Sequence, residues 1–297
     1  MSNKTKNILL ALCAVIWGSA FVAQSVASDY MGAFSFNASR FIVGSIALIP
    51  FAYVSINKKK KEINKEEYSK YIKTSIKAGC IVGFFQLLAS TCQQLGITYS
   101  SASKAGFITA LYIVLVPIIS IVLYKKKVSR NVWIGVAIAV VGFYFLSIKG
   151  DFTIEFSDLL LLLCAIFYSF QILSIDKYAS QSDAFLLTQF QFIFAGIVSL
   201  IISLFVDIES YKNIGNALLP ILYAGIFSCC IAYSLQVIGQ KDNNPTIASI
   251  IMSLESVFSC FFGVLLLSET LTGREILGCI LIFSAVIISQ LPSKTKL

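Results

Sequence analysis

The sequence predicts an all-α membrane protein with ten transmembrane helices arranged as two inverted five-helix repeats. Its composition is the first reason: 57% of the 297 residues are hydrophobic, 13% are charged, and the mean hydropathy is +0.84. A soluble chain of this length needs more charge to cover its surface, so lipid is the expected solvent. The spacing of the apolar segments and an internal repeat are the other two reasons.

The apolar residues fall into segments that are long enough to cross a bilayer as helices. A hydrocarbon core of about 30 Å needs about 20 helical residues, and barrel strands would be shorter and would alternate in polarity. Helices are therefore expected, because lipid leaves every backbone polar group to be satisfied within the segment. The ten predicted segments are 7–27, 34–56, 77–96, 103–124, 131–148, 157–175, 184–206, 216–238, 245–267 and 274–291.

Basic residues between these segments predict the orientation. With the N-terminus inside, 18 Lys and Arg residues lie on the cytoplasmic side and 4 lie outside, and Arg40 lies within a segment. This bias places both termini in the cytoplasm. The net charge of +8 is spread over such short runs, for example Lys58 to Lys61, so we interpret it as an orientation signal and expect no nucleic-acid partner. The bilayer is the expected large partner, in the cell membrane, and the oligomeric state is left open.

Cysteine and histidine usage argues against metal and disulfide chemistry. The eight cysteines lie in apolar segments without CxxC spacing, and there is no histidine. We therefore expect no cofactor, metal site or catalytic residue. Lys4, Lys6 and the following apolar run also resemble a signal peptide, but the repeat described next predicts that this segment is retained.

The second half of the chain repeats the first. Residues 93–147 align without a gap on 236–290 at a shift of 143, so that Tyr112 pairs with Glu255. A shift of 151 aligns the earlier part and pairs Trp17 with Tyr168. The two shifts differ by 8 residues, which we attribute to a longer basic loop in the first half, Asn57 to Lys77. Because five helices is an odd number, the second copy enters the membrane from the opposite side, as in many secondary transporters. The predicted repeats are residues 1–150 and 151–297.

Four stretches resemble the EamA-like family of the drug/metabolite transporter (DMT) superfamily. They are IWGSAFVA (16–23), RFIVG (40–44), TYSSASKAGFI (98–108) and SLESVFSCFFGVLLLSETLTGREILG (253–278). The chain departs from the family pattern at Ser256, where a Pro is common, and at Lys125-Lys126, where a Gly-Glu pair is common. The resemblance implies alternating access and a substrate pathway between the first, third, fourth, sixth, eighth and ninth helices. It leaves the solute open among amino acids, nucleotide sugars, amines and other metabolites.

Two ionisable residues are predicted near the middle of the membrane. Glu255 lies ten residues beyond Pro245, which is about 15 Å of helix, and Arg40 lies about 9 Å along its own segment. Intramembrane charges usually mark function or a buried pair. Glu255 is thus either a substrate contact or proton-linked carboxylate, or one half of a structural pair with Arg40. Together the two charges suit a zwitterion such as an amino acid.

Aromatic and amide side chains complete the set of candidate substrate-binding residues. Trp17, Tyr112 and Tyr168 are expected at mid-depth, where they either line a cavity or pack between helices. Buried amides either bind a polar solute or bond to each other across helices. The four amides are Gln86, Gln93, Gln171 and Gln236.

The predicted function is secondary transport of a small polar metabolite, with amino acids or related compounds favoured. The chain has no GxxxxGK[ST] loop for ATP, so protons or exchange are the expected coupling, with Glu255 as the candidate carboxylate. Export of amphipathic drugs or amines is the alternative. An intramembrane lipid-modifying enzyme would need catalytic clusters, and a channel would need charge rings or a carbonyl filter; the sequence shows neither.

Overall fold

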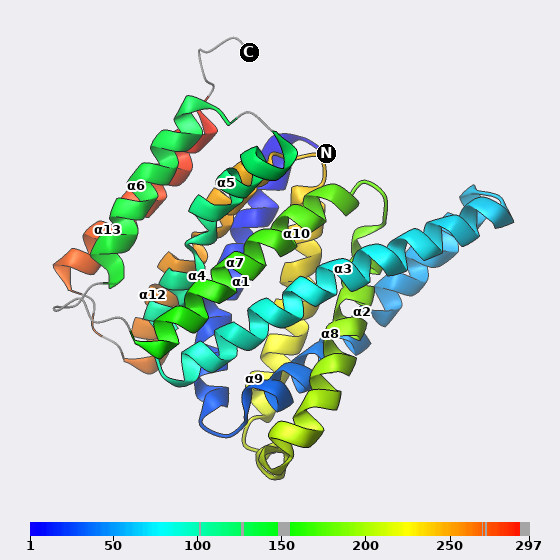
Figure 1. Ribbon diagram of the computed structural model, residues 1–297, viewed down its shortest axis with the longest axis horizontal. Coiled ribbons are helices and arrows are strands. Elements are labelled where there is room, and N and C mark those ends of the chain that lie inside the picture. Colours follow the sequence, from blue (N-terminus) through cyan, green and yellow to red (C-terminus); the bar gives the residue numbers. More distant parts are fainter. Residues whose placement is uncertain (101, 126–127, 148–154, 269, 271, 292–297) are drawn as a thin grey trace.

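The helices of this chain form a bundle in which segments from the two halves lie side by side (Figure 1). The computed structural model describes residues 1–100, 102–125, 128–147, 155–268, 270 and 272–291. In chain order its helices are α1 (Asn3–Ser28), α2 (Ala33–Glu62), α3 (Lys65–Thr98), α4 (Ala102–Thr109), α5 (Tyr112–Tyr124), α6 (Arg130–Ser147), α7 (Phe156–Tyr178), α8 (Ala184–Val206), η1 (Ile208–Asn213), α9 (Leu218–Tyr223), η2 (Ala224–Ala232), α10 (Tyr233–Gln240), α11 (Pro245–Met252), α12 (Glu255–Leu267) and α13 (Gly273–Gln290).

Eight helical spans in the described residues are long and apolar enough to cross a membrane. They include α4–α5, α9–η2–α10 and α11–α12, each counted as one span although the sequence predicted an unbroken helix there. The predicted segments 131–148 and 274–291 coincide with two shorter apolar helices, Arg130–Phe145 and Ile276–Ser289. The all-α membrane architecture is therefore confirmed, whereas the count of ten spanning helices and the side of the termini stay predictions.

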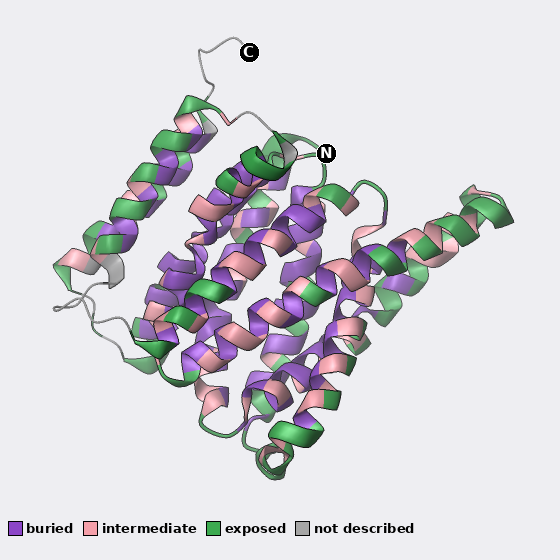
Figure 2. Ribbon diagram, in the orientation of Figure 1, coloured by how far each residue is buried: buried purple, intermediate pink, exposed green. Residues whose placement is uncertain are grey.

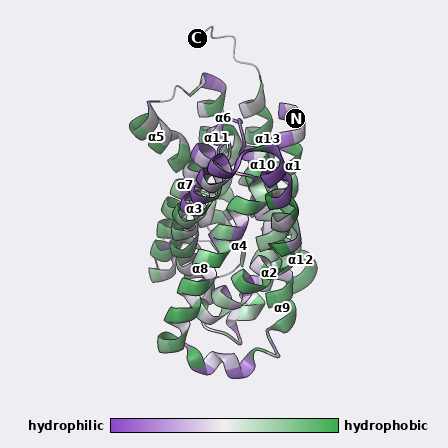
Figure 3. Cartoon of the chain, turned by 90° about the vertical axis from the view of Figure 1, so that its right-hand side faces the viewer, coloured by the Kyte–Doolittle hydropathy of each residue, from purple (hydrophilic) through white to green (hydrophobic). Residues whose placement is uncertain are grey.

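Apolar side chains cover the outside of the bundle as well as its interior. Buried residues line the inward faces of the helices, and exposed ones face outward (Figure 2). The exposed set includes large hydrophobic residues such as Phe205, Leu219 and Val122. Hydrophobic residues run along the helices, and hydrophilic ones gather where the end of the α2–α3 hairpin faces the viewer in Figure 3. An outside of this kind matches lipid rather than water as the surrounding medium.

The basic stretch Asn57 to Lys77 is helical, so the predicted loop was wrong. Helix α2 continues to Glu62 and α3 begins at Lys65, which leaves a two-residue turn and a hairpin that projects beyond the bundle (Figure 1). Asn64 accepts a hydrogen bond from the Glu67 amide at 2.9 Å and forms a capping box with it. Lys and Glu are good helix formers, and this cap gives the second helix a defined start.

Two contacts join repeat-related positions of the two halves. Phe41 of α2 stacks on Phe192 of α8, its partner at the shift of 151, with ring centroids 5.2 Å apart. Helices α6 and α13 approach closely at glycines. A methyl group built on Gly135 would lie 2.9 Å from the Ala285 carbonyl oxygen. One built on Gly142 would lie 2.9 Å from the carbonyl oxygen of Gly278. At the shift of 143, Gly135 corresponds to Gly278 and Gly142 to Ala285, so the repeat relates the residue pair Gly135–Ala285 to the residue pair Gly142–Gly278.

Candidate functional site

The first broken helix, α4–α5, changes its hydrogen bonding at residues 110 and 111. The Leu111 amide donates to the Ile108 carbonyl at 3.2 Å, and the Ile113 amide donates to the Ala110 carbonyl at 3.0 Å. Each bond reaches back three residues instead of the four of an α-helix. The axis is therefore interrupted, and α5 begins afresh at Tyr112, in the middle of the predicted segment.

The second broken helix, α11–α12, repeats this pattern 143 residues later. The Leu254 amide donates to the Ile251 carbonyl at 3.2 Å, and the Ser256 amide donates to the Ser253 carbonyl at 3.1 Å. Helix α12 begins at Glu255, the partner of Tyr112. Both broken helices thus start a new helix near the middle of a candidate membrane span, and one start carries an acid while the other carries a phenol.

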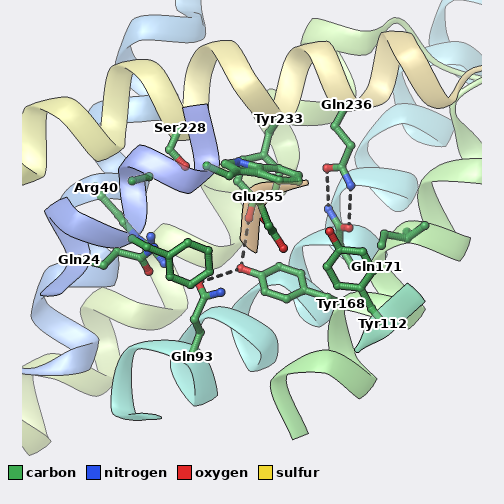
Figure 4. A pocket seen from close by; sticks show the side chains of 14 residues that line it. Gln24, Arg40, Gln93, Tyr112, Tyr168, Gln171, Ser228, Tyr233, Gln236 and Glu255 are labelled. Carbon is green, nitrogen blue, oxygen red and sulfur yellow. Dashed lines mark hydrogen bonds between the residues drawn. The ribbon is translucent and has the colours of Figure 1, made fainter. Parts of the chain in front are cut away.

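A cavity lies beside these two helix starts. It has a volume of about 30 Å³. Because one water molecule needs about 10–15 Å³ measured in this way, the cavity has room for about two water molecules. Its lining comes from both halves of the chain, and Figure 4 shows the side chains converging from several helices. The lining residues are Trp17, Ala20, Phe21, Gln24, Arg40, Gln93, Tyr112, Tyr168, Gln171, Ile172, Ser228, Tyr233, Gln236 and Glu255.

Glu255 carries the acidic group of this cavity. Its side chain is 4% exposed, and among the described residues no hydrogen-bond donor reaches its Oε1. The hydroxyl of Tyr112, which is 2% exposed, lies beside the Glu255 carboxyl group but forms no hydrogen bond of good geometry within the described part of the chain. Buried polar atoms are normally hydrogen-bonded, because leaving one unpaired costs about 1–3 kcal/mol. Both atoms are therefore available to a polar ligand.

Arg40 carries the basic group and is held only at one edge. Its Nε donates to the Asn37 side-chain oxygen at 2.9 Å, and its guanidinium lies 5.3 and 5.0 Å from the ring centroids of Phe36 and Phe41. Its Nη2 has no hydrogen-bond partner among the described residues. The described contacts also include no ion pair between Arg40 and Glu255. The two charges thus share a cavity without the direct pair that was one of the predicted alternatives.

Tyrosines and amides form one wall of the cavity. The Tyr168 hydroxyl donates to the Gln93 side-chain oxygen at 3.4 Å and lies 3.2 Å from the Tyr233 hydroxyl. Gln171 and Gln236 exchange two hydrogen bonds of 3.2 Å each (Figure 4). These two amides therefore bond to each other across α7 and α10, and both line the cavity.

Eight of the nine predicted residues line this cavity, and Gln86 does not. The Gln86 amide donates to the Tyr233 hydroxyl at 2.8 Å and accepts from Gln191 at 3.3 Å. It is fully buried behind the tyrosine wall. It was predicted as a buried amide that binds solute or bonds across helices, and its side chain bonds across to α8 and α10.

Three polar lining residues were missed from the sequence. Tyr233 is central, since its ring also packs against Trp17 with centroids 4.8 Å apart. Tyr233 lies five residues from the end of the predicted segment 216–238, so the mid-depth rule that selected Tyr168 did not select it. Gln24 and Ser228 had no comparable signal. Ser228 lies in η2, a π-helical segment whose wider turns no propensity predicts.

In the comparisons with known proteins, one family model covers nearly the whole chain. The model of the EamA-like transporter family matches residues 4–148 and again 155–290. An uncharacterized transporter of Archaeoglobus fulgidus is 35% identical over 282 residues, which cover 95% of this chain and 84% of the relative. An S-adenosylmethionine/S-adenosylhomocysteine transporter of Chlamydia muridarum is 25% identical over 93% of this chain and 90% of the relative. A protein of known crystal structure superposes with a TM-score of 0.76 over 97% of both chains, at 16% identity.

Proposed function

The chain belongs to the EamA-like transporter family of the DMT superfamily, and we propose that it is a secondary transporter of a small polar metabolite, with amino acids or related compounds favoured. That it is a multi-pass integral membrane protein and a transporter follows from the family and from its apolar helices. The solute class and the mechanism are the parts that we infer from the cavity.

One observation carries the choice of solute: the cavity holds an acid and a base that are not paired with each other. A zwitterion places its ammonium group on a carboxylate such as Glu255 and its carboxylate on a guanidinium such as Arg40. Trp17 Nε1 and Gln24 Oε1 also lack partners among the described residues, and they add one donor and one acceptor. A bound amino acid would satisfy groups that otherwise remain costly to bury.

The named Chlamydia muridarum relative is consistent with this class. S-adenosylmethionine and S-adenosylhomocysteine both contain an amino-acid end with an ammonium and a carboxylate. The aromatic rings of Trp17, Tyr168 and Tyr233 beside a carboxylate would also suit an amphipathic amine, which is the second candidate. Arg40 disfavours the amine, because it adds a positive charge to the same space.

Alternating access of two inverted repeats, residues 1–150 and 151–297, is the proposed mechanism. The matching breaks before Tyr112 and Glu255 support the repeat, as does the stack of Phe41 on Phe192. With ten membrane helices and cytoplasmic termini, the two halves have opposite orientations and can exchange inward-open and outward-open states. A cavity of about 30 Å³ is too small for an amino acid, so this conformation is a closed one that must open to load.

Thermal unfolding in detergent against a panel of amino acids, amines, nucleotides and sugars tests the proposal. A ligand at 100 times its Kd stabilises the folded state by about 2.7 kcal/mol, which raises the Tm. We expect selective shifts from amino acids that disappear in Glu255→Gln and Arg40→Gln. Glu66→Gln, an exposed site on the α2–α3 hairpin, is the matched control and should keep the shift.

Other outcomes point elsewhere. A shift produced by amines alone, and retained in Arg40→Gln, would favour the amine exporter. If no compound shifts the Tm and both variants unfold far below the wild type, Glu255 and Arg40 are structural residues and the site assignment is wrong.

A further inference from the structure

A second hollow lies on the outside of the bundle, between α1, α11 and α13. Its volume is about 510 Å³, and it is separate from the cavity at Glu255. One end is polar and is formed by Asn3, Lys4, Asn7 and Asn243. The remaining lining is apolar: Ile8, Ala11, Ile247, Ile251, Leu254 and Val286. The groove is thus amphipathic along its length.

The polar end is an electropositive mouth. Helices α1 and α11 both begin there, at Asn3 and Pro245, and the positive ends of their dipoles point to the same place. The two starts are tied together, since the Asn243 amide donates to the Asn7 side-chain oxygen at 3.1 Å. The Lys6 ammonium donates to the Asp242 carbonyl at 3.2 Å.

The charges around the mouth favour an anion. Lys4 is exposed and lines the groove, and Lys6 lies nearby with Asp242 as the acidic neighbour. Two positive charges against one negative charge leave a positive excess that attracts a phosphate. The apolar part then continues from Ile8 to Ala11 and from Ile247 to Leu254, towards the middle of the helices.

The length of the apolar part fits one leaflet of a bilayer. From Ile247 to Leu254 the chain rises about 10 Å, compared with about 15 Å for half of a hydrocarbon core. Helix α1 is one of the candidate membrane spans, and so is the unit α11–α12, so the medium at this depth is acyl chains. An anionic head followed by about 10 Å of hydrocarbon describes a phospholipid at the end of its leaflet.

We propose that this groove binds one phospholipid with an anionic headgroup, its phosphate at Lys4 and its acyl chain along Ile8, Ala11 and Leu254. The occupied groove would join α1 to the broken helix α11–α12, because Leu254 immediately precedes Glu255. The site is distinct from the solute cavity and does not depend on which solute is carried.

Native mass spectrometry of the delipidated protein titrated with phosphatidylglycerol tests this site. Lys4→Glu should weaken binding of the first lipid at least about tenfold, since each basic residue near an anionic lipid is worth about 1 kcal/mol and reversal counts twice. Ala11→Phe should fill the groove and have a similar effect. Two matched controls should leave the first lipid bound: Lys70→Glu on the α2–α3 hairpin, and Leu12→Phe on the exposed side of α1.

The same titration can overturn the proposal. Equal loss in Lys4→Glu and Lys70→Glu would mean that the lipid responds only to overall charge. Equal binding of phosphatidylcholine would contradict the anionic headgroup. Lipid-free dimers that Ala11→Phe abolishes would assign the groove to a second copy of the chain. If Ala11→Phe does not fold, as judged by its Tm, Ala11→Leu replaces it.

Discussion

The broken helices α4–α5 and α11–α12 have the same backbone geometry but carry different side chains where their second helices begin. Their three-residue hydrogen bonds fall at positions related by 143, and both units end in a left-handed residue, Lys125 (φ 52°) and Ser268 (φ 56°), which are also 143 apart. At the equivalent helix starts, however, one carries Tyr112 and the other Glu255. The two broken helices therefore have similar backbones, and the acid on only one of them makes the cavity beside them asymmetric.

This asymmetry has a physical advantage for a site that binds an asymmetric solute. Two acids at equivalent positions would repel each other in a medium of low dielectric constant. One acid beside a phenol avoids that cost and gives the cavity a negative end. Arg40, from α2, supplies the opposite sign from outside the pair of broken helices.

The largest expected effect comes from removing the acid. Glu255→Gln should weaken solute binding by about 2–5 kcal/mol, as when one partner of a buried charged contact is truncated. Transport measured as solute uptake into proteoliposomes should fall by roughly 30-fold or more. The Tm without solute should stay near that of the wild type, because an uncompensated buried carboxylate does not stabilise the fold. Uptake at the wild-type rate would show that the asymmetry has no role in transport.

The repeat relates the residue pair Gly135–Ala285 to the residue pair Gly142–Gly278, so we expect similar effects from substitutions at these two glycines of α6. Gly135→Val and Gly142→Val each push a side chain into a carbonyl of α13, at Ala285 and Gly278 respectively. Overpacking at such contacts costs about 1–3 kcal/mol. We expect the two variants to lower the Tm in detergent by similar amounts. A large difference between them would mean that α6 and α13 do not pack symmetrically.

A smaller effect is expected at the phenol. Tyr112→Phe removes a hydroxyl that has no partner among the described residues, so the loss is limited to one hydrogen bond with solute, about 1 kcal/mol. The solute Kd from isothermal titration should rise by about fivefold. If Tyr112→Phe is as damaging as Glu255→Gln, the two helix starts contribute equally and the contrast between them is wrong.

The smallest effect concerns how the two broken helices are anchored. Lys104, near the start of α4, pairs with Asp158 of α7 at 2.8 Å and with Glu155 at 3.4 Å, whereas its partner position in α11 is Ile247. Lys104→Gln should lower the free energy of unfolding by about 0.2–1 kcal/mol, measured by chemical denaturation in detergent. Lys212→Gln, which breaks an exposed pair with Glu209, is the control and should change nothing measurable.

The depth of the candidate residues could be predicted, but not all of their directions. Helical rise is constant, so counting from Pro245 placed Glu255 near the middle, and the structure puts it beside the cavity. Gln86 was also predicted as a buried amide, but it bonds to Tyr233 and Gln191 instead of lining the cavity. Which way a side chain faces depends on how a helix is rotated against its neighbours, and nearly uniform apolar sequence encodes that rotation weakly.

The sequence by itself determined the solvent of this protein, its helical class and its family, because transfer of apolar surface into lipid and backbone pairing depend on composition and length. It also indicated the repeat that relates Tyr112 to Glu255. Only the tertiary structure decided where the helices break, that Tyr233 completes the wall, and that Arg40 and Glu255 share a cavity without an ion pair. Those features depend on contacts between segments far apart in the chain, whose packing no local pattern specifies.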